Sequence, residues 1–168
     1  NELPVSLIHL TLGHSYNCPL PKLPNSIKYL DLGYSYDKPL LELPESLTEL
    51  ILSHEYKYQL PELPESLIKL TLSYFYNELL LNLPSNLTHL TLGFYYNQPL
   101  INLPNSLTHL ILGNCFNQLL DELPQGLLYL ELRRKYNKPL NNLPNTLETL
   151  IINSYDYNYS LDLIPDSI

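Results

Sequence analysis

Residues Asn86–Leu120 read NLTHLTLGFYYNQPLINLPNSLTHLILGNCFNQLL, and this stretch states nearly the same pattern twice. Thr-His-Leu-x-Leu-Gly occurs at Thr88–Gly93 and again at Thr108–Gly113, and an Asn-Gln pair follows each copy. A fixed interval of this length is typical of repeat proteins, in which successive units stack along one axis. The predicted fold therefore depends on how far the 20-residue period extends.

The same period runs through the whole chain of 168 residues. Leucine-proline steps recur every 20 residues and begin at Leu3, Leu23, Leu43, Leu63, Leu83, Leu103, Leu123 and Leu143. A partial ninth unit begins at Ile164, one residue late, because one extra residue lies between Ile152 and Tyr157. No linker or change of composition interrupts the series. Residues 1–168 are therefore predicted to form a single continuous repeat array.

Two local structures compete for the apolar pattern within one unit. The spacing of Leu3, Leu7 and Leu10 suits one face of a helix, but Pro4 lies just inside it, and Leu10-x-Leu12 has the two-residue step of a strand. We therefore predict a short parallel strand at Leu10–Leu12 and at each copy. The remainder of each coil is predicted to be extended, polyproline-like or a single helical turn, which gives a horseshoe-shaped repeat solenoid.

The energetics explain why the unit must be repeated. Six inward side chains at about 2 kcal/mol each do not offset the ordering of one unit at about 1–2 kcal/mol per residue. Stacking lets every strand bond to two neighbours and covers both sides of each leucine layer. The array is therefore stable only as an array.

Composition and charge argue against several classes of function. The formal net charge of −8 disfavours nonspecific binding to nucleic acid, which needs lysine and arginine against phosphate. No apolar run approaches the roughly 18 residues that span a bilayer, so no membrane segment is predicted. With only two cysteines, a reducing compartment is indicated, and we expect a cytoplasmic protein. The chain lacks methionine, so we expect it to be a fragment, a processed product or an incomplete sequence.

The repeat resembles known leucine-rich units. Leu7-x-x-Leu10-x-Leu12 matches the strand signature of leucine-rich repeats, and Leu103–Leu110 with Phe116-Asn117 is similar to the FNIP repeats of slime moulds and giant viruses. The resemblance implies a horseshoe solenoid. It also implies a role as substrate receptor of a ubiquitin ligase, because FNIP arrays often accompany an F-box; no F-box-like segment is present here. A giant-virus source would place the protein in the host cytoplasm or on the virion.

The polar residues that recur in register are predicted to be structural. The asparagines at the turn after each strand are expected to cap backbone groups: Asn17, Asn77, Asn97, Asn117, Asn137 and Asn158. His89 and His109 are expected to lie roughly 5 Å apart on neighbouring strands, which is too few ligands for zinc. No catalytic set, phosphate loop or cofactor motif is evident, so we predict a protein without catalysis, cofactor or metal.

The positions that vary between units carry the candidate site. Residues flanking the buried leucines are predicted to point outward from the concave face, and a further row follows the strands. We predict that both rows bind a protein through aromatic, histidine and charged side chains. The candidate residues of the first row are His9, Tyr29, Glu49, Lys69, His89, His109 and Tyr129, and those of the second are Tyr34, Tyr74, Phe94 and Arg134. Drift at unconstrained exposed positions is the competing interpretation.

A second function is open on sequence grounds. Neither end carries an evident cap, and bare leucine layers or unpaired strand edges invite another coil. The alternative to a binding scaffold is therefore a segment of a fibre or head-to-tail filament, formed by end-to-end self-association.

Overall fold

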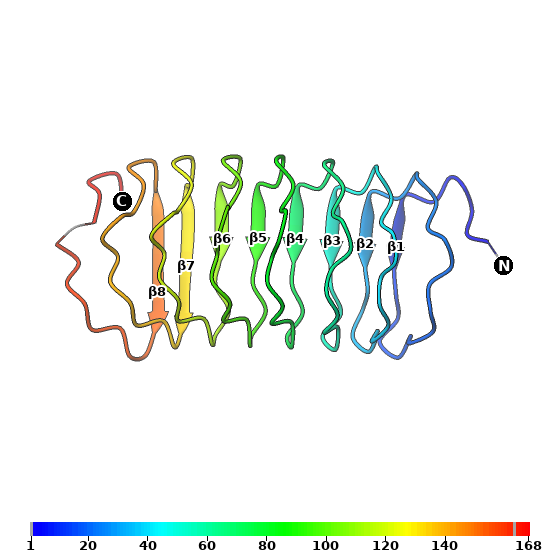
Figure 1. The fold of residues 1–168 in the computed structure, drawn as a ribbon, viewed down its shortest axis with the longest axis horizontal. Coiled ribbons are helices and arrows are strands. Elements are labelled where there is room, and N and C mark those ends of the chain that lie inside the picture. The colour runs from blue at the N-terminus through cyan, green and yellow to red at the C-terminus, as the bar shows by residue number, and fades with distance from the viewer. Residues whose placement is uncertain (1, 163) are drawn as a thin grey trace.

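The computed structural model describes residues 2–162 and 164–168, and its coils stack side by side in one row (Figure 1). Each coil contributes one strand to a single parallel sheet whose order follows the chain from β1 to β8. The strands are β1 His9–Thr11, β2 Tyr29–Asp31, β3 Glu49–Ile51, β4 Lys69–Thr71, β5 His89–Thr91, β6 His109–Ile111, β7 Tyr129–Arg134 and β8 Thr149–Ser154. The predicted leucine-rich solenoid is confirmed.

The pairing register equals the repeat period. Leu10 pairs with Leu30, Leu30 with Leu50, and the same step continues to Leu150. Each predicted strand is found. β1 to β6 lie one residue earlier than Leu10–Leu12 and its copies, as at His9–Thr11, whereas β7 and β8 start one residue earlier and extend past the predicted end. The backbone bonds explain the small difference, since the Leu12 amide still donates to the Asp31 carbonyl at 2.8 Å, just beyond the assigned strand.

The rest of each coil is built from two tight turns and extended chain. The first turn follows the proline, where the Leu7 amide donates to the Pro4 carbonyl at 3.0 Å; the second follows the strand, where the Tyr16 amide donates to the Gly13 carbonyl at 3.1 Å. No helix occurs in the described part of the chain, so the single-turn helix expected as one form of the convex side is absent there. Proline in every unit accounts for this outcome.

The core consists of ladders of identical side chains. Leu47, Leu67 and Leu87 are fully buried one above another, and Tyr56, Tyr76 and Tyr96 form a second ladder of fully buried rings. Rings of successive coils stack, with centroids 6.4 Å apart between Tyr76 and Tyr96. Because every layer is covered by its neighbours, burial is shared along the array as expected for a solenoid.

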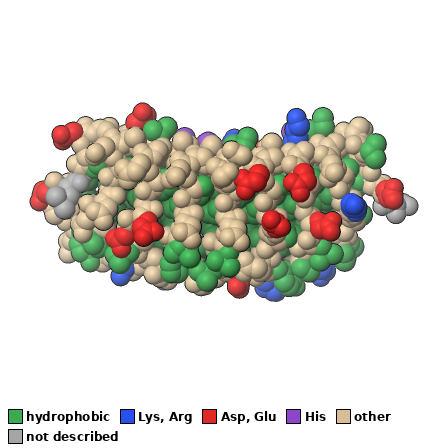
Figure 2. Space-filling view, turned by 45° about the horizontal axis from the view of Figure 1, so that its top comes forward, with side chains coloured by type: hydrophobic (Ala, Val, Ile, Leu, Met, Phe, Trp, Pro, Cys, Tyr) green, Lys and Arg blue, Asp and Glu red, His purple; other side chains and the backbone are tan. Residues whose placement is uncertain are grey.

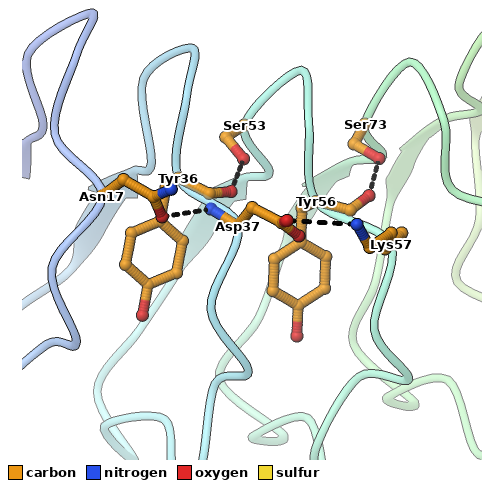
Figure 3. Close-up of polar contacts among 7 residues, drawn as sticks. All are labelled: Asn17, Tyr36, Asp37, Ser53, Tyr56, Lys57 and Ser73. Carbon is orange, nitrogen blue, oxygen red and sulfur yellow. Dashed lines mark hydrogen bonds and ion pairs between the residues drawn. The ribbon is translucent and has the colours of Figure 1, made fainter.

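Polar side chains bond the coils to one another at the turns (Figure 3). The Asp37 amide donates to Asn17 Oδ1 at 2.9 Å, and the same bond of 2.8 Å joins the Asn97 amide to Asn77. The predicted asparagine ladder is thus confirmed. Lys57 interrupts it and instead places its Nζ 3.1 Å from Asp37 Oδ2.

Buried serines make a second set of links in the same region. The hydroxyls of Ser53 and Ser73 donate to the carbonyls of Tyr36 and Tyr56 in the preceding coils (Figure 3). At the proline turn, Ser26 Oγ likewise donates to the Leu7 carbonyl at 2.7 Å. These hydroxyls satisfy backbone acceptors of the preceding coil.

The extra residue of the last full unit can be placed more closely. Arg134 still pairs with Ser154 at the 20-residue step, but Tyr136 stacks on Tyr157, which is one residue further. The insertion therefore lies between Ser154 and Tyr157. The partial ninth unit makes its proline turn as well, since the Ile168 amide donates to the Pro165 carbonyl at 3.3 Å.

Candidate functional site on the sheet face

The row of coils is bowed, and the sheet lies on its hollow side. In Figure 2 the upper outline dips in the middle and the lower outline bulges. Histidine side chains show at the dipping outline, and the histidines belong to the strands or to the turns that follow them. The outward residues of the strands therefore line the concave face. Acidic side chains are seen on the face between the two outlines that Figure 2 turns to the viewer.

The first candidate row follows the start of each strand across this face. Paired neighbours in the row are His9 with Tyr29, Glu49 with Lys69, and His109 with Tyr129. Their side chains flank the buried Leu10 series and are partly or largely exposed, as expected when side chains alternate along a strand. The structure therefore brings all seven residues of this row together on one surface.

The two central histidines stack on each other. The rings of His89 and His109 lie 4.2 Å apart with an angle of 9° between their planes, close to the separation expected from sequence. Nδ1 of each ring contacts the preceding threonine hydroxyl, at 2.7 Å in Thr88 and 2.9 Å in Thr108. The pKa of His89 is lowered below its usual value, mainly by partial burial and also by the neighbouring His109 and Lys69. The lowered pKa favours a neutral imidazole at pH 7.

The second candidate row lies just beyond the strands, at the rim of the concave face. Its rings form a continuous stack, with centroids 4.4 Å apart between Tyr34 and His54 and 4.5 Å between Tyr74 and Phe94. Because neighbouring rings cover each other's faces, mainly ring edges are left for a ligand. The stack ends at Phe94, since Asn114 and Arg134 continue the row without an aromatic ring.

Two aromatic residues of this rim were missed by the sequence analysis. Phe75 and Tyr95 are 43% and 45% exposed, and their rings lie 5.6 Å apart. Tyr95 also meets Tyr74 edge to face at 5.3 Å. The available signal was that the same repeat position holds serine in the first two units but an aromatic residue in the fourth and fifth. Together with the half-buried Tyr74 and Phe94, these two exposed residues form a cluster of aromatic rings at the rim.

The charged end of the rim is organised by Glu131. Its carboxylate accepts from Arg133 Nε at 2.7 Å and from the Tyr129 hydroxyl at 3.2 Å. The guanidinium of Arg134 lies over the ring of Tyr155, 5.7 Å from its centre. These contacts hold cationic groups beside the aromatic rim, in a protein whose net charge is −8.

The concave face has the chemistry of a recognition surface. In the part of the chain that the structure describes, no group of three or more histidine, cysteine or acidic side chains is arranged to hold a metal ion. No described helix is long and apolar enough to cross a membrane. Aromatic, imidazole, carboxylate and guanidinium groups instead alternate over a rigid sheet, which suits hydrogen bonding and stacking against another molecule.

The family follows from the repeat and its match to known proteins. The model of the FNIP Repeat family matches residues 1–35, 20–54, 75–115 and 116–155. The chain belongs to the FNIP repeat family. This confirms the resemblance drawn from the Leu-Pro and Tyr-Asn pattern, although this FNIP array has Tyr in place of Phe in every unit but one.

Two solved structures are similar to this FNIP array. CroV588, described as a novel circular leucine-rich-repeat protein structure, is 34% identical over 99% of this chain and 27% of its own, with a TM-score of 0.90. YopM from Yersinia enterocolitica WA-314 is 27% identical over 92% of this chain and 39% of its own, with a TM-score of 0.56. This chain thus spans well under half of either protein. No curated protein matches it.

Proposed function

We propose that this FNIP array is a non-catalytic scaffold that binds a partner protein on its concave face. The observation that carries the proposal is the set of in-register rows, which keep the leucines inward and vary the outward side chains between coils. Leucine-rich-repeat folds typically bind protein partners, and the tyrosine and arginine side chains of this face are of the kinds that contribute most at such contacts.

Capture from host-cell extract tests the proposal. Tyr29→Ala/Tyr129→Ala removes two rings of the first row, one near each end of the sheet. The matched control, Leu41→Ala/Leu81→Ala, removes two side chains that are 84% and 56% exposed and lie outside the strands. We expect the tyrosine variant to lose the proteins that the native chain captures and the control to keep them. Equal capture by all three chains would contradict binding on the concave face.

A finer role follows from the family resemblance. We infer that such an array presents its captured protein to a ubiquitin ligase when the same polypeptide carries an F-box, and that it works in the cytoplasm, which is the host cytoplasm if the source is a virus. The support is the family's frequent association with that domain. Coprecipitation of the complete gene product with ubiquitin-ligase core subunits is expected, and a complete product that neither contains an F-box nor binds them would overturn this role.

One observation favours the filament as a second candidate. The first coil leaves an apolar hollow of about 470 Å³ lined by Leu3, Leu10, Leu12 and Tyr16, which a further coil would fill. Such a coil could come from a second copy stacked end to end, for example on a virion, or from the same polypeptide closing a ring like the circular CroV588. Sedimentation at several concentrations distinguishes the states, since growth with concentration supports a filament and a constant monomer excludes it.

A further inference from the structure

The sheet changes width between β6 and β7. Strand β6 ends at Ile111, but β7 and β8 stay paired for three more residues, to Arg134 and Ser154. At the repeat position where the two kinds of strand differ, the sixth coil has Gly113 and the seventh has Arg133. A Cβ on Gly113 would lie 1.8 Å from the Gly93 carbonyl oxygen, so the backbone of the sixth coil leaves no room for a side chain at this point.

Beside the longer strands lies a notch at the rim, which we define by Asn114, Arg133, Arg134 and Ser154. A hollow of about 390 Å³ is lined by these side chains together with Glu131, Asn153 and Tyr155. The bond to Glu131 occupies one of the five N–H donors of Arg133, and Tyr155 occupies one face of the Arg134 guanidinium. Both arginines line the hollow and keep N–H donors that these two contacts do not use, while their side chains are held in place.

The notch adjoins a second hollow that has aromatic rings in its lining. The adjoining space of about 240 Å³ shares Asn114 and Arg133 with the notch and is lined by Tyr74 and Phe94. Phe94 is the last ring of the rim stack, so its side toward Asn114 is not covered by another ring. A ligand that crosses both hollows would meet an aromatic ring first and two guanidinium groups next.

We propose that the notch binds an extended acidic segment of the partner protein, with a carboxylate between Arg133 and Arg134 and an apolar side chain against Phe94. This inference rests on the proposed scaffold function and names the chemistry of its partner. Charge complementarity selects the occupant, because planar guanidinium donors match a carboxylate in geometry and charge. Arg133, Arg134 and Lys135 follow one another directly, in a chain of net charge −8.

Fluorescence anisotropy with a labelled peptide tests the notch. The probe contains adjacent aspartate and glutamate residues flanked by phenylalanine, and a second peptide has asparagine and glutamine in their place. We expect the acidic peptide alone to bind, more weakly as salt is raised. Arg133→Gln/Arg134→Gln should weaken binding at least about tenfold through loss of charged hydrogen bonds. Lys22→Gln/Lys28→Gln makes the same charge change on the first two coils and should leave the affinity within about twofold.

Each result decides the proposal. Equal loss in the two double variants would show that the peptide responds to overall charge only, and absence of binding at about 1 mM peptide would also overturn the notch. Circular dichroism and the unfolding midpoint confirm that both variants are folded. If the notch fails while capture still depends on Tyr29 and Tyr129, the scaffold function stands without it. If the Tyr29→Ala/Tyr129→Ala variant captures the same proteins as the native chain, the scaffold function itself is overturned.

Discussion

The hydroxyl of Tyr136 is buried in the stacked core without a hydrogen-bond partner, as are those of Tyr76 and Tyr96. A buried polar group without a partner costs about 1–3 kcal/mol, whereas its removal leaves the packed ring intact. Phe116 occupies the same ladder and shows that the hydroxyl is not needed for stacking on Tyr136, at 6.3 Å. At the scale of the residue, the ladder is held by ring burial rather than by its oxygens.

Removal of this hydroxyl should therefore not weaken the fold. We expect Tyr136→Phe to leave the free energy of unfolding unchanged or raise it by about 1 kcal/mol. Tyr56→Phe is the matched control, because the Tyr56 hydroxyl accepts from the Leu40 amide at 3.4 Å, and its loss should cost up to about 1 kcal/mol. Urea unfolding of both variants measures the difference. A Tyr136→Phe variant less stable than Tyr56→Phe would contradict this account.

The tyrosine ladder should make stability fall at alkaline pH. Burial raises the pKa of Tyr76 to about 12 and also raises the pKa values of Tyr56, Tyr96 and Tyr136. In the unfolded chain the phenols ionise near pH 10. The contribution of the buried, neutral phenols to the free energy of unfolding is therefore fully present below that pH, and it is lost as pH rises through their pKa values in the folded protein. The urea midpoint should therefore drop between about pH 10 and 12. In Tyr76→Phe the unfolding reaction should release about one proton fewer, and an unchanged pH slope would contradict this.

At the scale of the element, the glycines that follow the strands differ in how closely they approach the neighbouring coil. A Cβ on Gly93 would lie 1.6 Å from the Ser73 carbonyl oxygen, whereas one on Gly13 would meet no atom within 4 Å. Both glycines occupy the same repeat position. The difference arises because Gly93 packs against a preceding coil and Gly13 belongs to the first coil. The same substitution should therefore be costly at Gly93 and nearly neutral at Gly13.

Gly93→Ala should destabilise the protein by about 2 kcal/mol or more, because the backbone must move to relieve overlap with a carbonyl. Gly13→Ala should change the free energy of unfolding by less than about 0.5 kcal/mol. Thermal and urea unfolding of the two variants provide the comparison. Equal effects at both positions would show that the close approach between coils is not as described.

Strand positions were readable from sequence because burial is periodic. The leucine step at Leu10 and Leu12 and the Asn ladder starting at Asn17 predicted elements that the structure contains. The width of β7 was not predicted, since the effect of Arg133 depends on the path of the neighbouring coil. The contact of Tyr95 with Tyr74 and Phe75 was missed for a similar reason, because only the stacking of coils brings Tyr95 beside them. Periodicity predicts the core, whereas departures from it need coordinates.

At the scale of the whole molecule, stability and the binding face have the same origin. Each coil has too little core of its own, and its strand and leucine layers are completed by the coils beside it. The concave rows exist only because the register between strands equals the repeat period. A change that keeps this register should be tolerated, and one that breaks it should not.

Removal of part of the array tests this claim most directly. Deletion of residues 81–100 takes out one full period and rejoins Leu80 to Ile101 in register, whereas deletion of residues 81–90 breaks it. The full-period deletion should fold, and it should unfold in a single transition. Its melting temperature should be lower than that of the native chain, because one interface between coils is lost. The half-period deletion should be unfolded or markedly less stable. Thermal melting followed by circular dichroism compares the two chains. Equal stability of the two deletions, or loss of folding in the full-period deletion alone, would contradict the account.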